Sequence, residues 1–258
     1  MTLSLAGKTF VVMGVANKRS IAWGIARSLH NSGARLIFTY AGERLEKNVR
    51  ELADTLEGQD AFILPCDITK DEEIEKCFAT IKEEVGTIHG LAHCIAFANK
   101  EDLAGEFVDT SRDGFLLAHN ISSYSLTAVA KAAKELMTEG GSIVTMTYLG
   151  GERVVTNYNV MGVAKASLDA SVRYLAADLG KHGIRINSIS AGPIRTLAAK
   201  GINDFNSILK EIEEKAPLRR TTTQEEVGDT AVFLFSDMSR GITGENIHVD
   251  SGYHILAR

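Results

Sequence analysis

Lys8-Thr9-Phe10-Val11-Val12-Met13-Gly14 is the stretch of sequence from which the fold of this chain is predicted. A run of β-branched and aromatic residues that ends in a glycine is typical of a short buried strand followed by a tight turn. Beyond the turn, residues 21–29 have apolar side chains at helical spacing. Strand, glycine turn and helix together predict the first half of a dinucleotide-binding unit, in which free amides at the helix start face a pyrophosphate.

The glycine pattern of this turn departs from the usual G-x-G-x-x-G. Ala16 and Ser20 stand where further glycines are expected, so an ordinary strand-to-helix turn remains an alternative at this point. Gly24 follows in the helix, and we expect it to let the helix approach the sheet closely.

Along the rest of the chain, short apolar runs alternate with segments of helical periodicity. Strands are predicted near residues 35–40, 61–66, 90–96, 142–148, 185–191 and 246–249, and helices at 45–56, 71–85, 112–137 and 157–182. This alternation predicts an α/β fold: one domain over residues 1–258, built on a doubly wound parallel sheet (a Rossmann fold) with helices on both faces. Ligands of such sheets bind beyond the carboxyl ends of the strands.

Composition narrows the class of protein. At 258 residues and 45% hydrophobic residues, the chain is long enough for one large core. A net charge of −5 argues against general nucleic-acid binding. No apolar run approaches the ~20 residues that a membrane span needs. The three cysteines are odd in number and form no C-x-x-C pattern, so we expect reduced thiols and a cytoplasmic protein.

Tyr158 and Lys165 form the most informative pair of side chains. Seven residues are almost two helical turns, so both side chains would share one helix face, about 10 Å apart along the axis. Lysine side chains lean toward the helix N-terminus, and a nearby cation lowers the pKa of a phenol and makes it a better acid. Taken alone, a solvated helix face is the plainer interpretation.

The sequence predicts no metal site. His89 and His93 are four residues apart but flank a predicted strand, where four residues span ~13 Å. The acidic residues Glu211, Glu213 and Glu214 are interpreted as a solvated helix face.

Several motifs carry a resemblance to a known family. These are Gly14-x5-Ser20-Ile21-Ala22-x-Gly24, Cys66-Asp67-Ile68, the stretch from Ser142 to Arg153, the stretch from Ser190 to Ala198, and the stretch from Ile242 to Asp250. With them, the chain resembles the short-chain dehydrogenase/reductase superfamily from end to end. Within that superfamily it closely resembles the bacterial enoyl-acyl-carrier-protein reductases of fatty acid synthesis.

Two departures from the general superfamily are typical of the enoyl-reducing branch. Most members carry Tyr-x-x-x-Lys, but Gly162 stands four residues after Tyr158 and Lys165 comes three later. Tyr148 replaces the usual serine on the preceding strand. In an enoyl thioester the oxygen that gains charge lies two carbons, roughly 2.5 Å, beyond the hydride acceptor. Moving the tyrosine three residues earlier displaces its Cα by about 4.5 Å, which we offer as the geometric reason.

The resemblance implies NADH-dependent hydride transfer to the β-carbon of a trans-2-enoyl thioester. Tyr158 would then donate a hydrogen bond to the thioester oxygen, and Lys165 would hold the nicotinamide ribose. Tyr148 would line the same site, either as an aromatic wall or as a participant in the chemistry. The residues implied in substrate binding are Ala98, Tyr148, Tyr158, Ile202 and Phe205.

Cofactor contacts follow from the same resemblance. The residues implied are Gly14, Ser20, Ile21, Ala41, Asp67, Ile68, Ile95, Lys165, Ile194, Arg195, Thr196, Leu197 and Ala198. Asp67 has an alternative as a turn cap before residues 69–73, and both roles are compatible. Glu43 favours NADH and Arg44 could accept the 2′-phosphate of NADPH; the resemblance favours NADH and leaves NADPH possible.

The resemblance also implies partners. An acyl-carrier protein would deliver the enoyl thioester, and a homotetramer would form through the helices predicted at 112–137 and 157–182. The segment from about residue 195 to 211 is predicted to be a mobile lid over the acyl chain, with Gly201 as a hinge. Two rival functions remain: a carbonyl or hydroxyl reductase of the β-ketoacyl type, and a catalytically silent nucleotide-sensing module.

Overall fold

A computed structural model describes residues 3–58, 61–196, 199 and 205–257 of the chain. Its centre is one seven-stranded, fully parallel sheet with the order β3-β2-β1-β4-β5-β6-β7. The strands are β1 (Thr9–Met13), β2 (Arg35–Tyr40), β3 (Phe62–Pro65), β4 (Gly90–His93), β5 (Gly141–Thr147), β6 (Ile184–Ala191) and β7 (Asn246–Val249). The predicted doubly wound parallel sheet is thereby confirmed.

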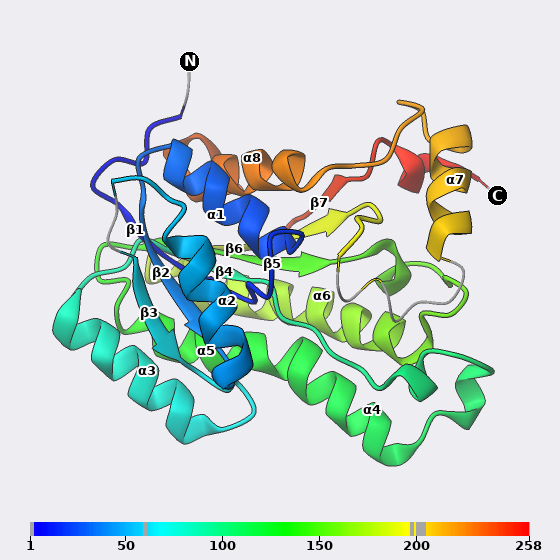
Figure 1. Ribbon diagram of the computed structural model, residues 1–258, viewed down its shortest axis with the longest axis horizontal. Helices are drawn as coiled ribbons and strands as arrows, with labels where there is room; N and C mark the ends of the chain where they lie inside the picture. The colour runs from blue at the N-terminus through cyan, green and yellow to red at the C-terminus, as the bar shows by residue number, and fades with distance from the viewer. Residues whose placement is uncertain (1–2, 59–60, 197–198, 200–204, 258) are drawn as a thin grey trace.

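Helices cover both faces of this sheet (Figure 1). One face carries α1 (Ile21–Asn31), α2 (Glu43–Ala53) and α8 (Gln224–Phe235), and the other carries α3 (Asp71–Glu84), α5 (Ser125–Lys134) and α6 (Asn159–Gly180). Two further helices, α4 (Arg112–His119) and α7 (Phe205–Lys215), lie toward the side where the strands end. Within the described ranges, no helix has the length and apolar character that a membrane span requires.

Side chains of β1 alternate between the two cores. Phe10 and Val12 pack with the helices α1 and α8, whereas Val11 and Met13 pack with α3, α5 and α6, and all four are fully buried. This is the pattern of a strand covered on both faces, and burial of each such side chain stabilises the fold by roughly 1.5–3 kcal/mol. The first strand therefore anchors both layers of helices.

Glycines mark two close backbone approaches near β1. Gly14 has φ of +94°, and a Cβ atom there would lie 2.1 Å from the carbonyl oxygen of Cys94. Both facts require glycine at the turn between β1 and α1. At Gly24 a Cβ would lie 2.5 Å from the carbonyl oxygen of Gln224. Gly24 thus lets α1 approach the start of α8, and our expectation that it approaches the sheet is wrong.

The helix predicted at 112–137 is interrupted by a π-helical turn, Asn120–Tyr124, between α4 and α5. The side chain of Ser122 in this turn accepts a hydrogen bond from the Phe97 amide at 2.9 Å and donates one to the Phe97 carbonyl at 3.1 Å. These contacts come from a distant loop, and apolar spacing cannot reveal them. A second difference is that β4 ends at His93, three residues before its predicted end.

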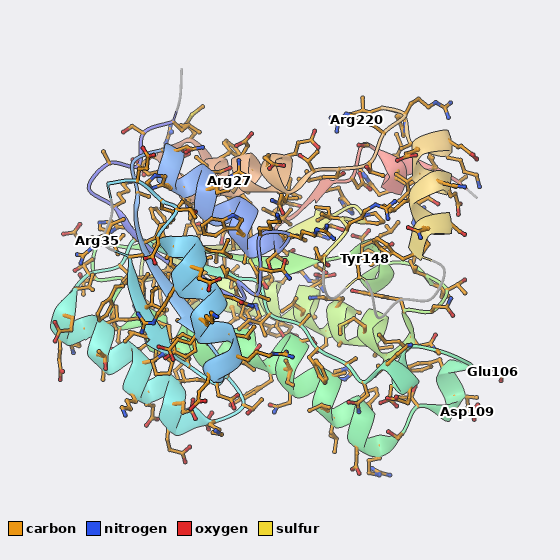
Figure 2. The ribbon with its side chains drawn as sticks, in the orientation of Figure 1. Arg27, Arg35, Glu106, Asp109, Tyr148 and Arg220 are labelled. Carbon is orange, nitrogen blue, oxygen red and sulfur yellow. The ribbon has the colours of Figure 1, made fainter. Side chains whose placement is uncertain are left out.

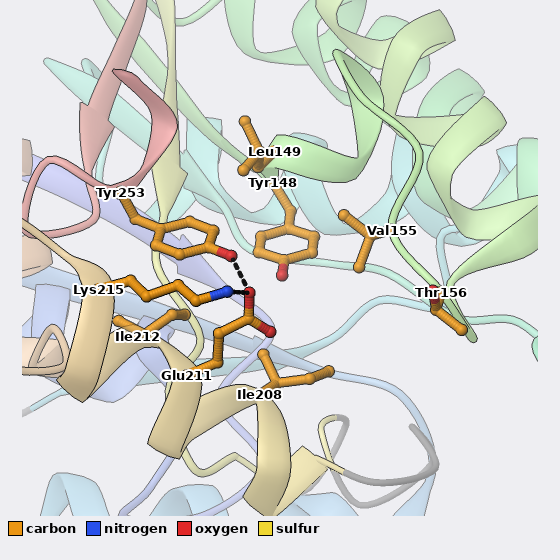
Figure 3. A pocket seen from close by; sticks show the side chains of 9 residues that line it. All are labelled: Tyr148, Leu149, Val155, Thr156, Ile208, Glu211, Ile212, Lys215 and Tyr253. Carbon is orange, nitrogen blue, oxygen red and sulfur yellow. Dashed lines mark hydrogen bonds and ion pairs between the residues drawn. The ribbon is translucent and has the colours of Figure 1, made fainter. Parts of the chain in front are cut away.

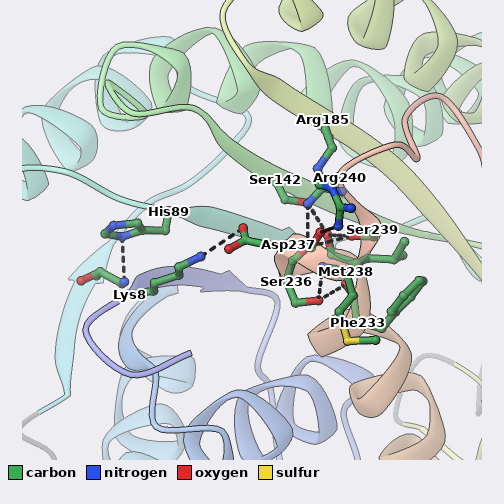
Figure 4. Close-up of polar contacts among 12 residues, drawn as sticks. Lys8, His89, Ser142, Arg185, Phe233, Ser236, Asp237, Met238, Ser239 and Arg240 are labelled. Carbon is green, nitrogen blue, oxygen red and sulfur yellow. Dashed lines mark hydrogen bonds and ion pairs between the residues drawn. The ribbon is translucent and has the colours of Figure 1, made fainter. Parts of the chain in front are cut away.

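Helix α8 was absent from the predicted elements, although its sequence carries a start signal. Thr223 and Glu226 form a reciprocal capping box at its N-terminus. At its C-terminus the Arg185 guanidinium donates to the carbonyls of Leu234 and Ser236 at 2.8 and 3.3 Å (Figure 4). A cation there complements the helix dipole.

His93 is fully buried between β5 and α5. Its Nδ1 lies 2.9 Å from the Thr145 hydroxyl and its Nε2 lies 2.8 Å from the Ser125 hydroxyl. Ser125 donates its own proton to the Ile121 carbonyl at 2.7 Å, so Nε2 of His93 is the donor of that pair. Burial, with the nearby charge of Lys165, lowers the pKa of His93 to about 3.

We predict that His93 makes the fold sensitive to acid. Because its folded pKa lies below the ordinary value, its contribution is fully present above pH 6.5 and is lost as the pH falls toward 3. The free energy of unfolding should decrease by about 1.4 kcal/mol per pH unit in this range from this group alone. Urea unfolding at pH 7 and pH 5 tests this. Between these pH values, the free energy of unfolding should decrease less in His93→Gln than in the wild type. In His182→Gln, a control at an exposed histidine, it should decrease as much as in the wild type. Equal decreases in all three proteins would contradict the prediction.

Candidate functional site

The candidate site lies at the carboxyl edge of the sheet, between β5 and α6. Tyr148 directly follows β5, and Tyr158 directly precedes α6 as its N-cap residue. In Figure 2, Tyr148 lies on the side of the molecule where α7 stands, whereas Arg35, at the amino end of β2, lies at the opposite side. The site thus occupies the position expected for ligands of a parallel sheet.

Three glycines let the segment after β5 pack directly on α6. A Cβ at Gly162 would lie 2.8 Å from the carbonyl oxygen of Gly150. A Cβ at Gly150 would lie 2.4 Å from the Tyr158 ring, and one at Gly151 would lie 3.1 Å from the backbone of Lys165. A side chain at position 162 therefore has no room in this structure.

The packing brings the two tyrosines together. The ring centroids of Tyr148 and Tyr158 are 4.9 Å apart at an interplanar angle of 73°, a favourable edge-to-face pair. Tyr158 is half-buried and shares a small apolar cluster with Ala98 and Met161. The structure thus brings together Ala98, Tyr148 and Tyr158, which the sequence analysis assigned to one site.

Lys165 is buried and is bound by strand β5. Its ammonium donates a hydrogen bond to the Met146 carbonyl at 2.7 Å, and the residue is only 4% exposed. Burial lowers the pKa of Lys165 to about 8, while the charges of Asp169 and Cys94 act to raise it. An ammonium has three donors, so two remain for other acceptors in the site.

The expectation that Lys165 lowers the pKa of Tyr158 is wrong for this structure. Burial raises the pKa of the phenol, and nearby Tyr148 and Asp169 raise it further. Tyr158 was also expected inside the predicted helix 157–182, but α6 begins at Asn159. The phenol therefore remains protonated at ordinary pH and acts as a hydrogen-bond donor.

A pocket of about 260 Å³ opens beside Tyr148 (Figure 3). Its lining comes from the segment after β5, from α7 and from the C-terminal turn: Tyr148, Leu149, Val155, Thr156, Ile208, Glu211, Ile212, Lys215 and Tyr253. Glu211 Oε1 accepts a hydrogen bond from the Tyr253 hydroxyl at 2.9 Å and pairs with Lys215 Nζ at 3.0 Å. Apolar walls with polar groups at one side suit a chain-like, mostly apolar ligand.

The turn after β1 is arranged as an anion site. The Ser20 hydroxyl accepts hydrogen bonds from the amides of Ala16 and Asn17, both at 3.1 Å, and so closes the turn. In the described part of the chain no side chain caps the first amides of α1, which begins at Ile21. Amides at a helix start that no side chain caps can bind an anion such as a pyrophosphate.

The remaining predicted residues fall into three groups. Asp67 accepts from the Thr69 amide at 3.0 Å and from its hydroxyl at 2.7 Å, so its role as a turn cap is confirmed. Ala41, Ile68, Ile95, Ile194, Arg195 and Thr196 all follow carboxyl ends of strands, and Phe205 begins α7. Leu197, Ala198 and Ile202 lie outside the described residues.

The remaining candidate metal ligands are histidine and acidic side chains. His89 Nδ1 accepts a hydrogen bond from the Thr9 amide at 3.0 Å, so it supports the sheet. Within the part of the chain that the structure describes, no group of three or more histidine, cysteine or acidic side chains could hold a metal ion.

Sequence reasoning missed several residues of the site. Asp169 lies one helical turn beyond Lys165, and the i,i+4 spacing on α6 is a signal that could have identified it. Gly150 and Gly151 lie in the stretch from Ser142 to Arg153, but their role in packing was not predicted. Glu211 and Tyr253 are 42 residues apart in the sequence, and no local pattern relates them.

A doubly wound sheet with a glycine turn after β1, a tyrosine at the start of a helix and a lysine within that helix is the arrangement of the short-chain dehydrogenase/reductase class. A family model described as Enoyl-(Acyl carrier protein) reductase matches residues 14–254. The chain is 82% identical over 252 residues to the enoyl-[acyl-carrier-protein] reductase [NADH] FabI of Bacillus cereus, with 98% of each sequence covered. It is 61% identical over 254 residues to the enoyl-[acyl-carrier-protein] reductase [NADPH] FabI of a Staphylococcus aureus strain, with 98% and 99% covered. The chain belongs to the enoyl-acyl-carrier-protein reductase family.

Solved structures agree with this assignment. The Bacillus cereus enoyl-acyl carrier protein reductase with NADP⁺ and indole naphthyridinone matches with a TM-score of 0.98 and 81% identity, covering 100% of both chains. The enoyl-[acyl-carrier-protein] reductase (NADH) of Aquifex aeolicus matches with a TM-score of 0.95 and 50% identity, covering 98% of this chain and 99% of the other.

We predict that Gly162→Ala damages the site. The added methyl group would lie 2.8 Å from the Gly150 carbonyl oxygen and must push the segment after β5 away, at a cost of about 1–3 kcal/mol in stability. A displacement of Tyr158 by ~1 Å should lower kcat by roughly 10- to 100-fold. Gly180→Ala on the same helix is the matched control, because nothing lies within 4 Å of its added methyl. Equal activity and melting temperature in the two variants would refute the close-approach argument.

Proposed function

We propose that this chain catalyses the NADH-dependent reduction of the trans-2 double bond in enoyl thioesters carried on acyl-carrier protein, the last reductive step of fatty acid elongation. The observation that carries the proposal is the pairing of Tyr148 and Tyr158 across the glycine contact at Gly162. The relatives named as enoyl-[acyl-carrier-protein] reductases support it. They favour it over the carbonyl reductase and the silent nucleotide sensor.

The residues present fit a nicotinamide dinucleotide. The uncapped amides at the start of α1 and the close turn at Gly14 suit a pyrophosphate, and the spare donors of Lys165 suit ribose hydroxyls. When bound, the reduced nicotinamide supplies the hydride that the β-carbon of the enoyl thioester accepts. Relatives named for NADH and for NADPH both occur, and the NADH-named Bacillus proteins are 82% and 80% identical to this chain. NADH is therefore the proposed cofactor.

Tyr158 has the proposed role of hydrogen-bond donor to the thioester oxygen. Hydride addition at the β-carbon places negative charge on that oxygen, and a buried donor aimed at developing charge stabilises the transition state. The raised pKa of Tyr158 keeps its proton in place for this task. Tyr148 supports the Tyr158 ring from the side and also lines the adjoining pocket.

The segment from about 195 to 211 has the proposed role of a lid. Its described part includes the start of α7, whose Ile208 and Ile212 line the pocket opposite Tyr148. The hydrogen bond between Tyr253 and Glu211 joins α7 to the C-terminal turn. An acyl chain needs an apolar enclosure that also opens for the carrier protein, which such a helix can provide.

A homotetramer is the proposed assembly. Exposed apolar side chains gather on α4, the π-helical turn and α6: Leu116 (59% exposed), Tyr124 (54%), Val163 (37%) and Tyr174 (79%). Apolar patches on helices of one layer favour association with another subunit. A monomer by light scattering would contradict this proposal. The proposed location is the cytoplasm, where the free thiols of Cys66, Cys77 and Cys94 stay reduced.

The roles of Tyr158 and Lys165 are separable by mutation. Tyr158→Phe should lower kcat roughly 10²- to 10³-fold and leave the Kd of NADH nearly unchanged, because the hydroxyl acts on charge of the transition state. Lys165→Met should weaken NADH binding roughly 10- to 100-fold, the value of charge-assisted hydrogen bonds. NADH fluorescence titration and steady-state kinetics with crotonyl thioester measure both. Opposite signatures would reverse the assignment, and wild-type NADH affinity in Lys165→Met would exclude the ribose-binding role.

Hydrogen exchange tests the lid. Amides of residues 205–211 should exchange quickly in the free enzyme and slowly with NAD⁺ and an acyl ligand bound, because closure would protect the start of α7. Amides of α5 serve as the control and should be equally protected in both states. Strong and equal protection of 205–211 in both states would show a permanently packed helix instead.

A further inference from the structure

Asp169 is a partly buried carboxylate that the proposed chemistry leaves without a role. It follows Lys165 by one turn of α6, so both side chains leave the same helix face. Its Oδ2 lies against Gly151, where a Cβ atom would come within 2.8 Å of it. Its Oδ1 is shielded from solvent and has no hydrogen-bond partner among the described residues. An acceptor left in this state costs free energy, which calls for a compensating function.

The charged and titratable groups around Asp169 come from three elements. Burial raises the pKa of the Asp169 carboxyl above its ordinary value. On α6, the charges of Lys165 and Arg173 act to lower this pKa, and after β5 the charge of Glu152 acts to raise it further. The Thr147 hydroxyl at the end of β5 also faces the carboxylate and lowers its pKa. Lys165 and Arg173 are thus the cations that face this carboxylate.

In the described part of the chain, the titratable groups that interact with Lys165 are His93, Cys94 and Asp169. His93 is neutral at ordinary pH, because its pKa is lowered to about 3. Burial raises the pKa of the Cys94 thiol to about 12, so it too is uncharged at neutral pH. The two groups that act to raise the pKa of Lys165 are Asp169 and Cys94, and of these only Asp169 is a carboxylic acid.

We propose that Asp169 is a positioning residue that keeps the Lys165 ammonium charged and directed at the cofactor. The Met146 carbonyl holds the ammonium from the sheet at 2.7 Å, and Asp169 supplies the opposing negative charge from the same helix face. The proposal rests on the proposed role of Lys165 in binding the ribose. A buried ammonium without a counter-charge loses its proton at lower pH, so loss of Asp169 should appear as a shift in the pH dependence of cofactor binding.

The test is the Kd of NADH for the full-length protein from pH 6 to pH 10, measured by fluorescence. In the wild type, affinity should fall as the pH rises through about 8, where Lys165 loses its charge. In Asp169→Asn the fall should occur roughly one pH unit lower, as expected for removal of one neighbouring charge. At pH 6 the two proteins should bind NADH within about threefold of each other, since Lys165 is charged in both.

Three further variants complete the design. Asp169→Glu retains the charge and should restore the wild-type profile, and Asp178→Asn, an exposed acid on the same helix, should leave it unchanged. Asp169→Ser carries the same expectation as Asp169→Asn and replaces it if the Asn variant does not fold.

The Lys165→Met variant distinguishes a failure of the role proposed for Asp169 from a failure of the ribose-binding role proposed for Lys165. If Lys165→Met binds NADH weakly at every pH and the profile of Asp169→Asn matches the wild type, the role of Asp169 is overturned and that of Lys165 stands. If Lys165→Met binds NADH like the wild type, the ribose-binding role of Lys165 fails, and the role of Asp169 fails with it. The readout is binding, so it does not depend on turnover of any acyl substrate.

Discussion

The backbone of the segment Leu149–Gly151 lies directly on helix α6, and the arrangement of the site depends on this contact. It is possible only because Gly150, Gly151 and Gly162 carry no side chains. The contact sets the ring of Tyr158 against the segment that carries Tyr148, and it leaves no room for a side chain at position 162. The relative position of the two tyrosines thus depends on these glycines.

Burial then decides how the polar groups of the site behave. The same exclusion of water raises the pKa of Tyr158 and lowers that of Lys165 to about 8, so the phenol holds its proton firmly and the ammonium holds its proton weakly. Local spacing suggested the reverse interaction, in which the lysine makes the tyrosine more acidic. At Tyr158, desolvation outweighs the effect of a cation that is turned toward the Met146 carbonyl.

Much of the framework could be predicted because it is local. Strands β2 and β7 match their predicted bounds at both ends, since each contains β-branched residues and is bounded by segments with turn-forming glycines. What escaped prediction depends on distant parts of the chain. The π-helical turn is stabilised by a loop more than twenty residues away through Ser122, and the pocket joins Glu211 to Tyr253. Spacing along one element carries no information on such contacts.

The geometry of the site suits an oxygen two carbons away from the hydride acceptor, and substrate choice tests this fit most directly. The measurement is kcat/KM with NADH for crotonyl and acetoacetyl thioesters of the same carrier. The account predicts rapid reduction of the crotonyl thioester and, with the acetoacetyl thioester, a value at least roughly 100-fold lower, as expected when a donor misses the developing charge. Equal or faster reduction of the acetoacetyl thioester would contradict it.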